Sequence, residues 1–112
     1  MAALLEEAAR GMYEMMGIEI ADESRRHRHL EMSADDREGL LVSFLEELLF
    51  LVDGEDIAFD GYLITIDGPQ LNAHLEGGFV VSRSKEIKAV TYHLLEIEES
   101  VRGLEASIIF DV

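Results

Sequence analysis

The sequence predicts an α+β domain of two layers, in which two helices pack on one face of a largely antiparallel β-sheet. Residues 2–16 and 36–52 carry apolar side chains at helical spacing. Residues 57–66 and 70–76, and two further segments after residue 85, alternate apolar and polar side chains as strands do. Short turns join these strands, which indicates antiparallel pairing.

A single domain, residues 1–112, is the expected organisation of a chain of 112 residues. Such a chain buries roughly 65% of its unfolded surface, which is enough for one core. Cysteine is absent, so disulfides and thiolate metal sites are excluded. No apolar run reaches the roughly 18 residues that span a bilayer, and we expect a cytoplasmic protein without a membrane partner.

The net charge of −15 is the strongest signal in the composition. Nucleic-acid affinity depends on cationic contacts to phosphates, so direct RNA binding is not expected. An acidic surface can instead steer toward a basic protein partner. The alternative is that the charge only aids solubility.

The first helix is predicted over residues 2–16, with Gly17 as its C-terminal stop. Its methionines could form a soft ligand-binding patch, but a flexible core face is the favoured interpretation. The predicted buried stripe consists of Leu4, Leu5, Ala8, Met12, Met15 and Met16.

The second helix, residues 36–52, is apolar on most sides and is expected to lie between the sheet and the first helix. Its capping signal is either Ser33 with Asp36 or Asp35 with Glu38. The acidic run at residues 53–56 lacks EF-hand spacing and predicts a solvated turn. The predicted buried stripe consists of Leu41, Phe44, Leu45, Leu48, Leu51 and Val52.

Residues 25–32 alternate loosely and predict an edge strand that is rich in arginine. His27 and His29 share one face of it at strand spacing, which could hold a metal ion. No third ligand is visible nearby in the sequence, so a solvated strand face is the favoured interpretation.

Residues 57–66 and 70–76 predict two strands joined by a turn at residues 67–69. His74 is expected to be exposed on the second of them. Gly77 and Gly78 are expected to open a loop that runs to about Ser84.

The C-terminal segments predict a hairpin with its turn at residues 101–102. In that register Phe110 faces His93 on an apolar side, and Asp111 faces Tyr92 on the outer side. An aspartate one residue from the C-terminus is an odd ending for a purely structural strand.

Three blocks of the sequence resemble the archease family, namely residues 41–50 (LVSFLEELLF), 86–93 (EIKAVTYH) and 109–112 (IFDV). The resemblance implies a small cytosolic protein cofactor of the GTP-dependent RNA ligase that seals tRNA halves. Such a protein promotes guanylylation and turnover of the ligase in tRNA splicing and RNA repair. The resemblance also implies a divalent-metal site for Ca²⁺ or Mg²⁺.

The resemblance places that metal site at Asp111. In archeases its partner ligand is the aspartate of a His-Thr-Ala-Asp segment on an N-terminal strand, and this sequence contains no such segment. We therefore expect an archease-like domain that lacks the first strand of the family. Further oxygen ligands could come from the terminal carboxylate, Glu47 or the region of Asp60.

Residues 86–93 are the block most characteristic of the archease family. The resemblance implies that three residues of this block, Lys88, Glu86 and Tyr92, contact the ligase or its nucleotide. Lys88 would meet an anionic group there. The alternative is that Lys88 forms only a surface ion pair, worth about 0–1 kcal/mol.

A sheet without its first strand has an unpaired edge, and such edges recruit other chains. We therefore expect a homodimer through that edge, unless the charges around Arg26 cover it and leave a monomer.

No nucleophilic triad and no phosphate-binding loop is readable, so we do not expect an enzyme. The rival function is a non-catalytic, metal-independent protein-interaction or chaperone-like domain. Stimulation of ligase turnover would separate the two.

Overall fold

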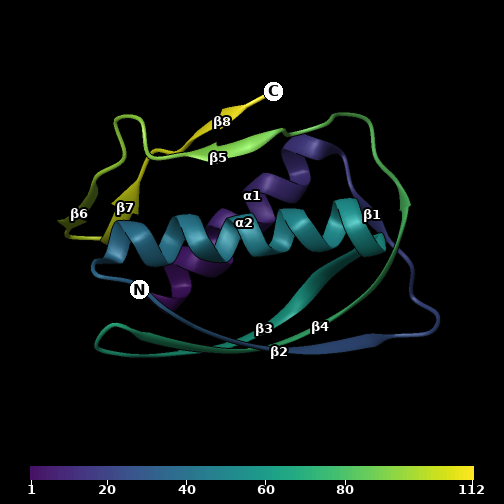
Figure 1. The fold of residues 1–112 in the computed structure, drawn as a ribbon, viewed down its shortest axis with the longest axis horizontal. Coiled ribbons are helices and arrows are strands. Elements are labelled where there is room, and N and C mark those ends of the chain that lie inside the picture. The colour runs from purple at the N-terminus through teal and green to yellow at the C-terminus, as the bar shows by residue number, and fades with distance from the viewer.

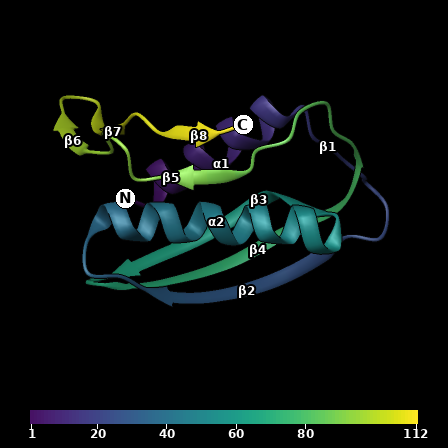
Figure 2. The ribbon, with the colours of Figure 1, turned by 45° about the horizontal axis from the view of Figure 1, so that its top comes forward.

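Two helices form the middle of the molecule, with a larger sheet on one side and short β-ribbons on the other (Figure 1). The computed structural model describes residues 1–112, and its helices are α1 (Ala2–Met16) and α2 (Arg37–Glu55). The strands are β1 (Glu19–Ile20), β2 (Arg26–Ser33), β3 (Ile57–Asp67), β4 (Gln70–Ser82), β5 (Ala89–Thr91), β6 (Ile97–Ser100), β7 (Gly103–Ala106) and β8 (Ile109–Asp111). The predicted α+β class is confirmed, and the ribbons add a third layer that the sequence did not predict (Figure 2).

Strand β4 is the centre of the larger sheet. It pairs antiparallel with β3 along one side and with β2 and the short β1 along the other. Strand β2 pairs only with β4, so the predicted edge strand is confirmed. Alternate residues of β4, among them Leu71, Ala73 and Leu75, are buried beneath the helices, while His74 faces solvent as predicted.

Helix α1 ends where the sequence predicts, because Gly17 adopts the left-handed conformation (φ 66°) that glycine tolerates best. Most of the predicted stripe is buried. The prediction for Met15 is wrong, since this residue is 45% exposed. Tyr13 is buried instead. Its hydroxyl oxygen accepts a hydrogen bond from the Phe59 N–H at 3.3 Å, which turns this half of the helix toward β3. Burial raises the pKa of the Tyr13 hydroxyl.

Helix α2 buries the whole predicted stripe. Its N-cap is Asp36, whose Oδ1 accepts from the Gly39 N–H at 2.7 Å, so neither predicted capping pair describes the actual bond. The helix continues through Glu55 and stops at Asp56, which is left-handed (φ 54°). The predicted turn at residues 53–56 is therefore mostly helix. Neither helix of the structure combines the length and the apolar character that crossing a membrane requires.

The predicted loop at Gly77 and Gly78 is wrong, because β4 runs straight through both residues to Ser82. A Cβ at Gly77 would lie 1.9 Å from the carbonyl oxygen of Ala58, and one at Gly78 would lie 2.6 Å from that of Ala21. The glycines therefore allow neighbouring backbone to approach β4 closely rather than breaking the strand.

Candidate partner-binding site

The C-terminal region forms two short antiparallel ribbons, β5 with β8 and β6 with β7. The predicted turn at residues 101–102 is confirmed, and Ile97 pairs with Ala106 as expected. Beyond that point the predicted register is wrong, because Val90 pairs with Phe110 and Ala89 with Asp111.

A turn between β5 and β6 causes this shift. The chain runs through residues 92–96 on that side, but only through residues 107–108 between β7 and β8. The extra residues fold into a turn in which the Leu95 N–H donates to the Tyr92 carbonyl at 3.0 Å and Leu94 is left-handed (φ 56°). A left-handed leucine is uncommon, and no simple alternation of residues predicts it.

The new register separates residues that the sequence had placed together. His93 is exposed in the turn and does not pair with Phe110, and Asp111 does not face Tyr92. Asp111 lies instead at the start of β5, where its carbonyl accepts a hydrogen bond from the Lys88 N–H at 2.6 Å. The ribbon therefore brings Lys88 next to Asp111 and leaves Tyr92 at the other end of β5.

Residues 86–88 lead into β5, and their side chains alternate between exposed and buried. Glu86 and Lys88 are exposed, whereas Ile87 between them is fully buried. Lys88 takes part in none of the salt bridges of the structure, so the surface ion pair considered for it is not observed. Ile87 thus anchors a segment whose charged groups face outward.

A complete metal site does not form around Asp111. No group of three or more histidine, aspartate or glutamate side chains is arranged to hold an ion. Asp60 lies in β3 of the other sheet, where its carboxylate is paired with Arg25. The chain therefore offers one aspartate at this place, next to a lysine, and hard divalent cations take six or more oxygen ligands.

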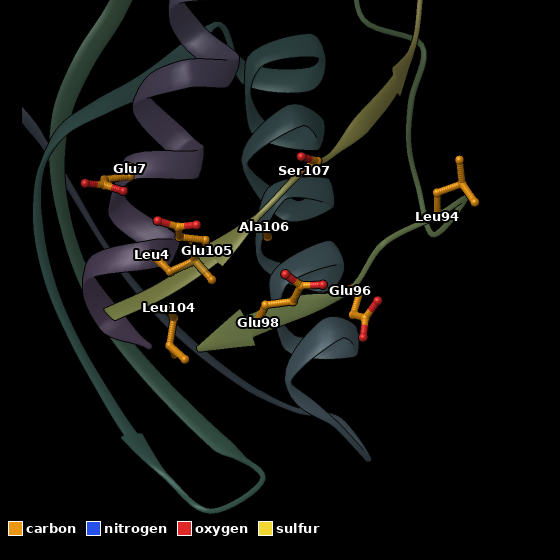
Figure 3. Close-up of a pocket in the computed structure, with 9 residues that line it drawn as sticks. All are labelled: Leu4, Glu7, Leu94, Glu96, Glu98, Leu104, Glu105, Ala106 and Ser107. Carbon is orange, nitrogen blue, oxygen red and sulfur yellow. The ribbon is translucent and has the colours of Figure 1, made fainter. Parts of the chain in front are cut away.

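An acidic hollow of about 470 Å³ lies between α1 and the β6–β7 ribbon (Figure 3). Glutamates of both elements line it, with Glu7 on the helix and Glu98 and Glu105 on the ribbon. The complete lining is Leu4, Glu7, Leu94, Glu96, Glu98, Leu104, Glu105, Ala106 and Ser107. The hollow was not predicted from the sequence, although the predicted hairpin register near the turn pairs Glu98 with Glu105, as the structure does.

Glu98 and Glu105 are a directly opposed pair of like charges. Such cross-strand pairs destabilise a ribbon. Both side chains line the same hollow as Glu96 and Glu7. This surface is chemically suited to cationic side chains and unsuited to phosphate.

The arrangement is that of a small α+β domain whose candidate contact residues, Glu86, Lys88 and Tyr92, are exposed rather than enclosed in a cleft. The chain belongs to the archease family, since the model of the "Archease protein family (MTH1598/TM1083)" matches residues 1–112.

Curated relatives agree with this assignment. The chain is 34% identical to the protein archease of Methanothermobacter thermautotrophicus, over 97% of this chain and 83% of that protein. It is 35% identical to the protein archease of Thermococcus gammatolerans, over 88% of this chain and 75% of that protein.

Two solved structures share the fold. The solution structure of Methanobacterium thermoautotrophicum protein 1598 matches with a TM-score of 0.72 and 31% identity, over 99% of this chain and 84% of that one. The crystal structure of a Thermotoga maritima archease, described as a possible chaperone, matches with a TM-score of 0.73 and 23% identity, over 96% and 80%.

Proposed function

We propose that this protein is a cytoplasmic, non-enzymatic cofactor of a GTP-dependent RNA ligase and promotes guanylylation and turnover of the ligase in tRNA splicing and RNA repair. The observation that carries the proposal is the family match over the whole chain. The fold supports it by placing residue blocks 86–93 and 109–112 side by side in one exposed ribbon.

In this proposal Lys88 binds an anionic group of the ligase or of its nucleotide. Its exposed ammonium group has no salt-bridge partner within the chain, and a lysine in that state can act as a point charge for an anion. Glu86 and Tyr92 flank it along the same segment and would contact the ligase surface. The backbone bond from Lys88 to Asp111 fixes the start of the segment.

The acidic hollow would receive basic side chains of the ligase. It has four glutamates and three leucines in its lining, so a lysine or arginine could place its stem on the leucines and its charge at the carboxylates. RNA would then be held by the ligase and not by this protein, in keeping with the net charge of −15.

Asp111 remains a proposed ligand for Ca²⁺ or Mg²⁺. Since the surroundings of Asp111 do not complete a site, the other oxygens would have to come from the ligase or from a second copy of this chain. No step of the proposed activation is assigned to the ion.

The test of the proposed function is ligase turnover with and without this protein. Lys88→Ala should abolish most of the stimulation and leave the melting temperature nearly unchanged, because the side chain is exposed. Lys85→Ala is the matched control, since Lys85 is the other lysine of the chain and is also exposed. Equal stimulation by wild type and Lys88→Ala would remove Lys88 from the contact, and no stimulation by wild type would overturn the function.

Direct RNA binding is a separate test. A gel shift with tRNA at low salt should show no complex with this protein alone. A complex that weakens steeply with added salt would contradict the role assigned to the acidic surface.

The metal is tested by calorimetry with Ca²⁺ and Mg²⁺, with this protein alone and with the ligase present. We expect binding heat that Asp111→Ala removes, most clearly in the mixture. Stimulation without any dependence on Asp111 or on divalent ions would favour the rival, a metal-independent interaction or chaperone-like domain. The description of the Thermotoga maritima relative as a possible chaperone gives that rival its support.

A homodimer is also proposed, through the β5–β8 ribbon. The two strands pair only with each other, so each has an unpaired edge that could recruit the same edge of a second chain. Sedimentation over a range of concentrations should show a dimer. A strictly monomeric species at the highest concentration would exclude it.

A further inference from the structure

The β6–β7 ribbon has one edge that the chain closes and one edge that it leaves open. Strands β6 and β7 pair only with each other, so neither has a strand on its outer side. On the outer side of β6, the Ile97 N–H donates to a carboxylate oxygen of Glu38 at 3.2 Å, which occupies that edge. On the outer side of β7, no hydrogen bond from the rest of the chain reaches the backbone of Leu104 or Ala106.

The register of the ribbon shows which backbone groups of β7 face outward. Ile97 lies opposite Ala106, and its N–H points away from β7 toward the helix, so the backbone groups of both residues face away from the ribbon. Leu104 lies two residues from Ala106 in the same strand and has the same orientation. Each of these two β7 residues therefore offers one N–H and one C=O to a further strand, and such open edges recruit extended chains.

The acidic hollow of about 470 Å³ borders this open edge (Figure 3). Four consecutive residues, 104–107, line it. Since successive side chains of a strand point to opposite faces, a cavity lined by consecutive residues follows the edge of the strand rather than one face. Strand β7 also contacts α1, which supplies Leu4 and Glu7 to the lining. The hollow therefore offers space along the edge of β7 for a short extended segment.

The two faces of the ribbon differ in their chemistry. Residues directly opposite each other share a face, so Glu98 and Glu105 lie together on one face, where both are exposed. Leu104 and Ala106 lie on the other face, where both are half-buried against the hydrophobic core. A strand added at the edge of β7 continues both faces. It fits best when basic side chains beside the glutamates alternate with apolar side chains beside Leu104 and Ala106.

We propose that the outer edge of β7 binds an extended basic–apolar segment of a protein partner as a third, antiparallel strand of the ribbon. The inference rests on the proposed function, which makes the ligase that partner. Every strand pair in the structure is antiparallel. Residues of an antiparallel strand that lie opposite Leu104 and Ala106 share their face and exchange both backbone bonds with them. The N–H groups that bind β7 therefore belong to the apolar residues of the segment.

Calorimetry with the end-blocked peptide Val-Lys-Val-Lys-Val-Lys as the probe tests the proposal without a ligase. Wild type should bind the peptide, and amide hydrogen exchange at Leu104 and Ala106 should slow in the complex. A peptide that is N-methylated at its valines should bind at least about tenfold more weakly, because it lacks the N–H groups that face β7. The matched control is N-methylated at its lysines, has the same charge and composition, and should bind like the unmodified peptide.

Variants of the protein test the charged face. Glu98→Gln and Glu105→Gln should each weaken peptide binding and reduce its salt dependence, whereas Glu46→Gln, at an exposed site on α2, should leave both unchanged. Absence of peptide binding by wild type, or equal binding of the two methylated peptides, would overturn the proposal. Ligase stimulation without peptide binding would overturn this inference and leave the proposed function intact. Peptide binding without ligase stimulation would support the strand site and overturn the proposed function.

Discussion

The helix–sheet body, residues 1–82, and the C-terminal region with the ribbons, residues 83–112, differ in how much of the hydrophobic core they contribute. Of the 24 residues of the hydrophobic core, only Ile87, Val90 and Ile97 come from the chain after residue 82. The same short region carries the lining of the acidic hollow except for Leu4 and Glu7 of α1, and it carries Glu86, Lys88 and Tyr92. The body supplies stability, and a thinly anchored surface is left free to carry charged groups, as is common for segments that bind partners.

Removing a core side chain from the body should have the largest effect. Phe44 is fully buried in α2, and Phe44→Ala should cost about 3–5 kcal/mol of unfolding free energy, because it leaves a cavity. Urea denaturation measures this. Phe50→Ala on the same helix is the control, since that side chain is 66% exposed and its loss should change the stability little.

The ribbon anchor should give a smaller and more local effect. Ile87→Ala removes a fully buried side chain and should cost about 2–5 kcal/mol, much of it as loosening of β5 and β8 rather than of the whole domain. Amide hydrogen exchange should accelerate in β5 and β8 and stay slow in β4. Ile109→Ala, at a site that is 40% exposed, is the control. Uniform acceleration throughout the chain would show that body and ribbons unfold as one unit.

The close approach at Gly77 can be tested in the same assay. Gly77→Ala forces the neighbouring backbone apart and should cost about 1–3 kcal/mol. Gly54→Ala, within α2 and with open space around its Cα, should instead stabilise the protein by about 0.5–1 kcal/mol. Equal effects of the two substitutions would contradict the packing described for β4.

The smallest effect is expected at the opposed carboxylates. Glu105→Lys turns the Glu98–Glu105 repulsion into attraction and should stabilise the protein by about 0.2–1 kcal/mol, less at high salt. Glu46→Lys makes the same charge change on an exposed face of α2 and serves as the control. If the hollow receives a basic segment, Glu105→Lys should also weaken ligase stimulation, while Glu46→Lys should not.

The local pattern of apolar residues and turn residues predicted most elements of the helix–sheet body correctly. It predicted the strand register of the ribbons only in part. The stripe of α2 and the stop at Gly17 follow from spacing and backbone preference, which act within a few residues. The pairing of Asp111 with Ala89 depends on an unpredicted turn, and no local signal reveals that Leu94 adopts a left-handed conformation. A single such turn changes which residues of the ribbon lie side by side.

The sequence by itself determined the fold class, both helices, the edge strand, the turn at residues 101–102 and the family resemblance. Each of these depends on periodicity, turn residues or motifs, and these signals lie in residues that are close together along the chain. Only the tertiary structure decided that Lys88 lies beside Asp111, that Glu7 shares a hollow with Glu105, and that His29 stacks on His74. Each of these contacts joins residues from different elements. Their positions are set by the register of strands and the packing of layers, which no local stretch of sequence specifies.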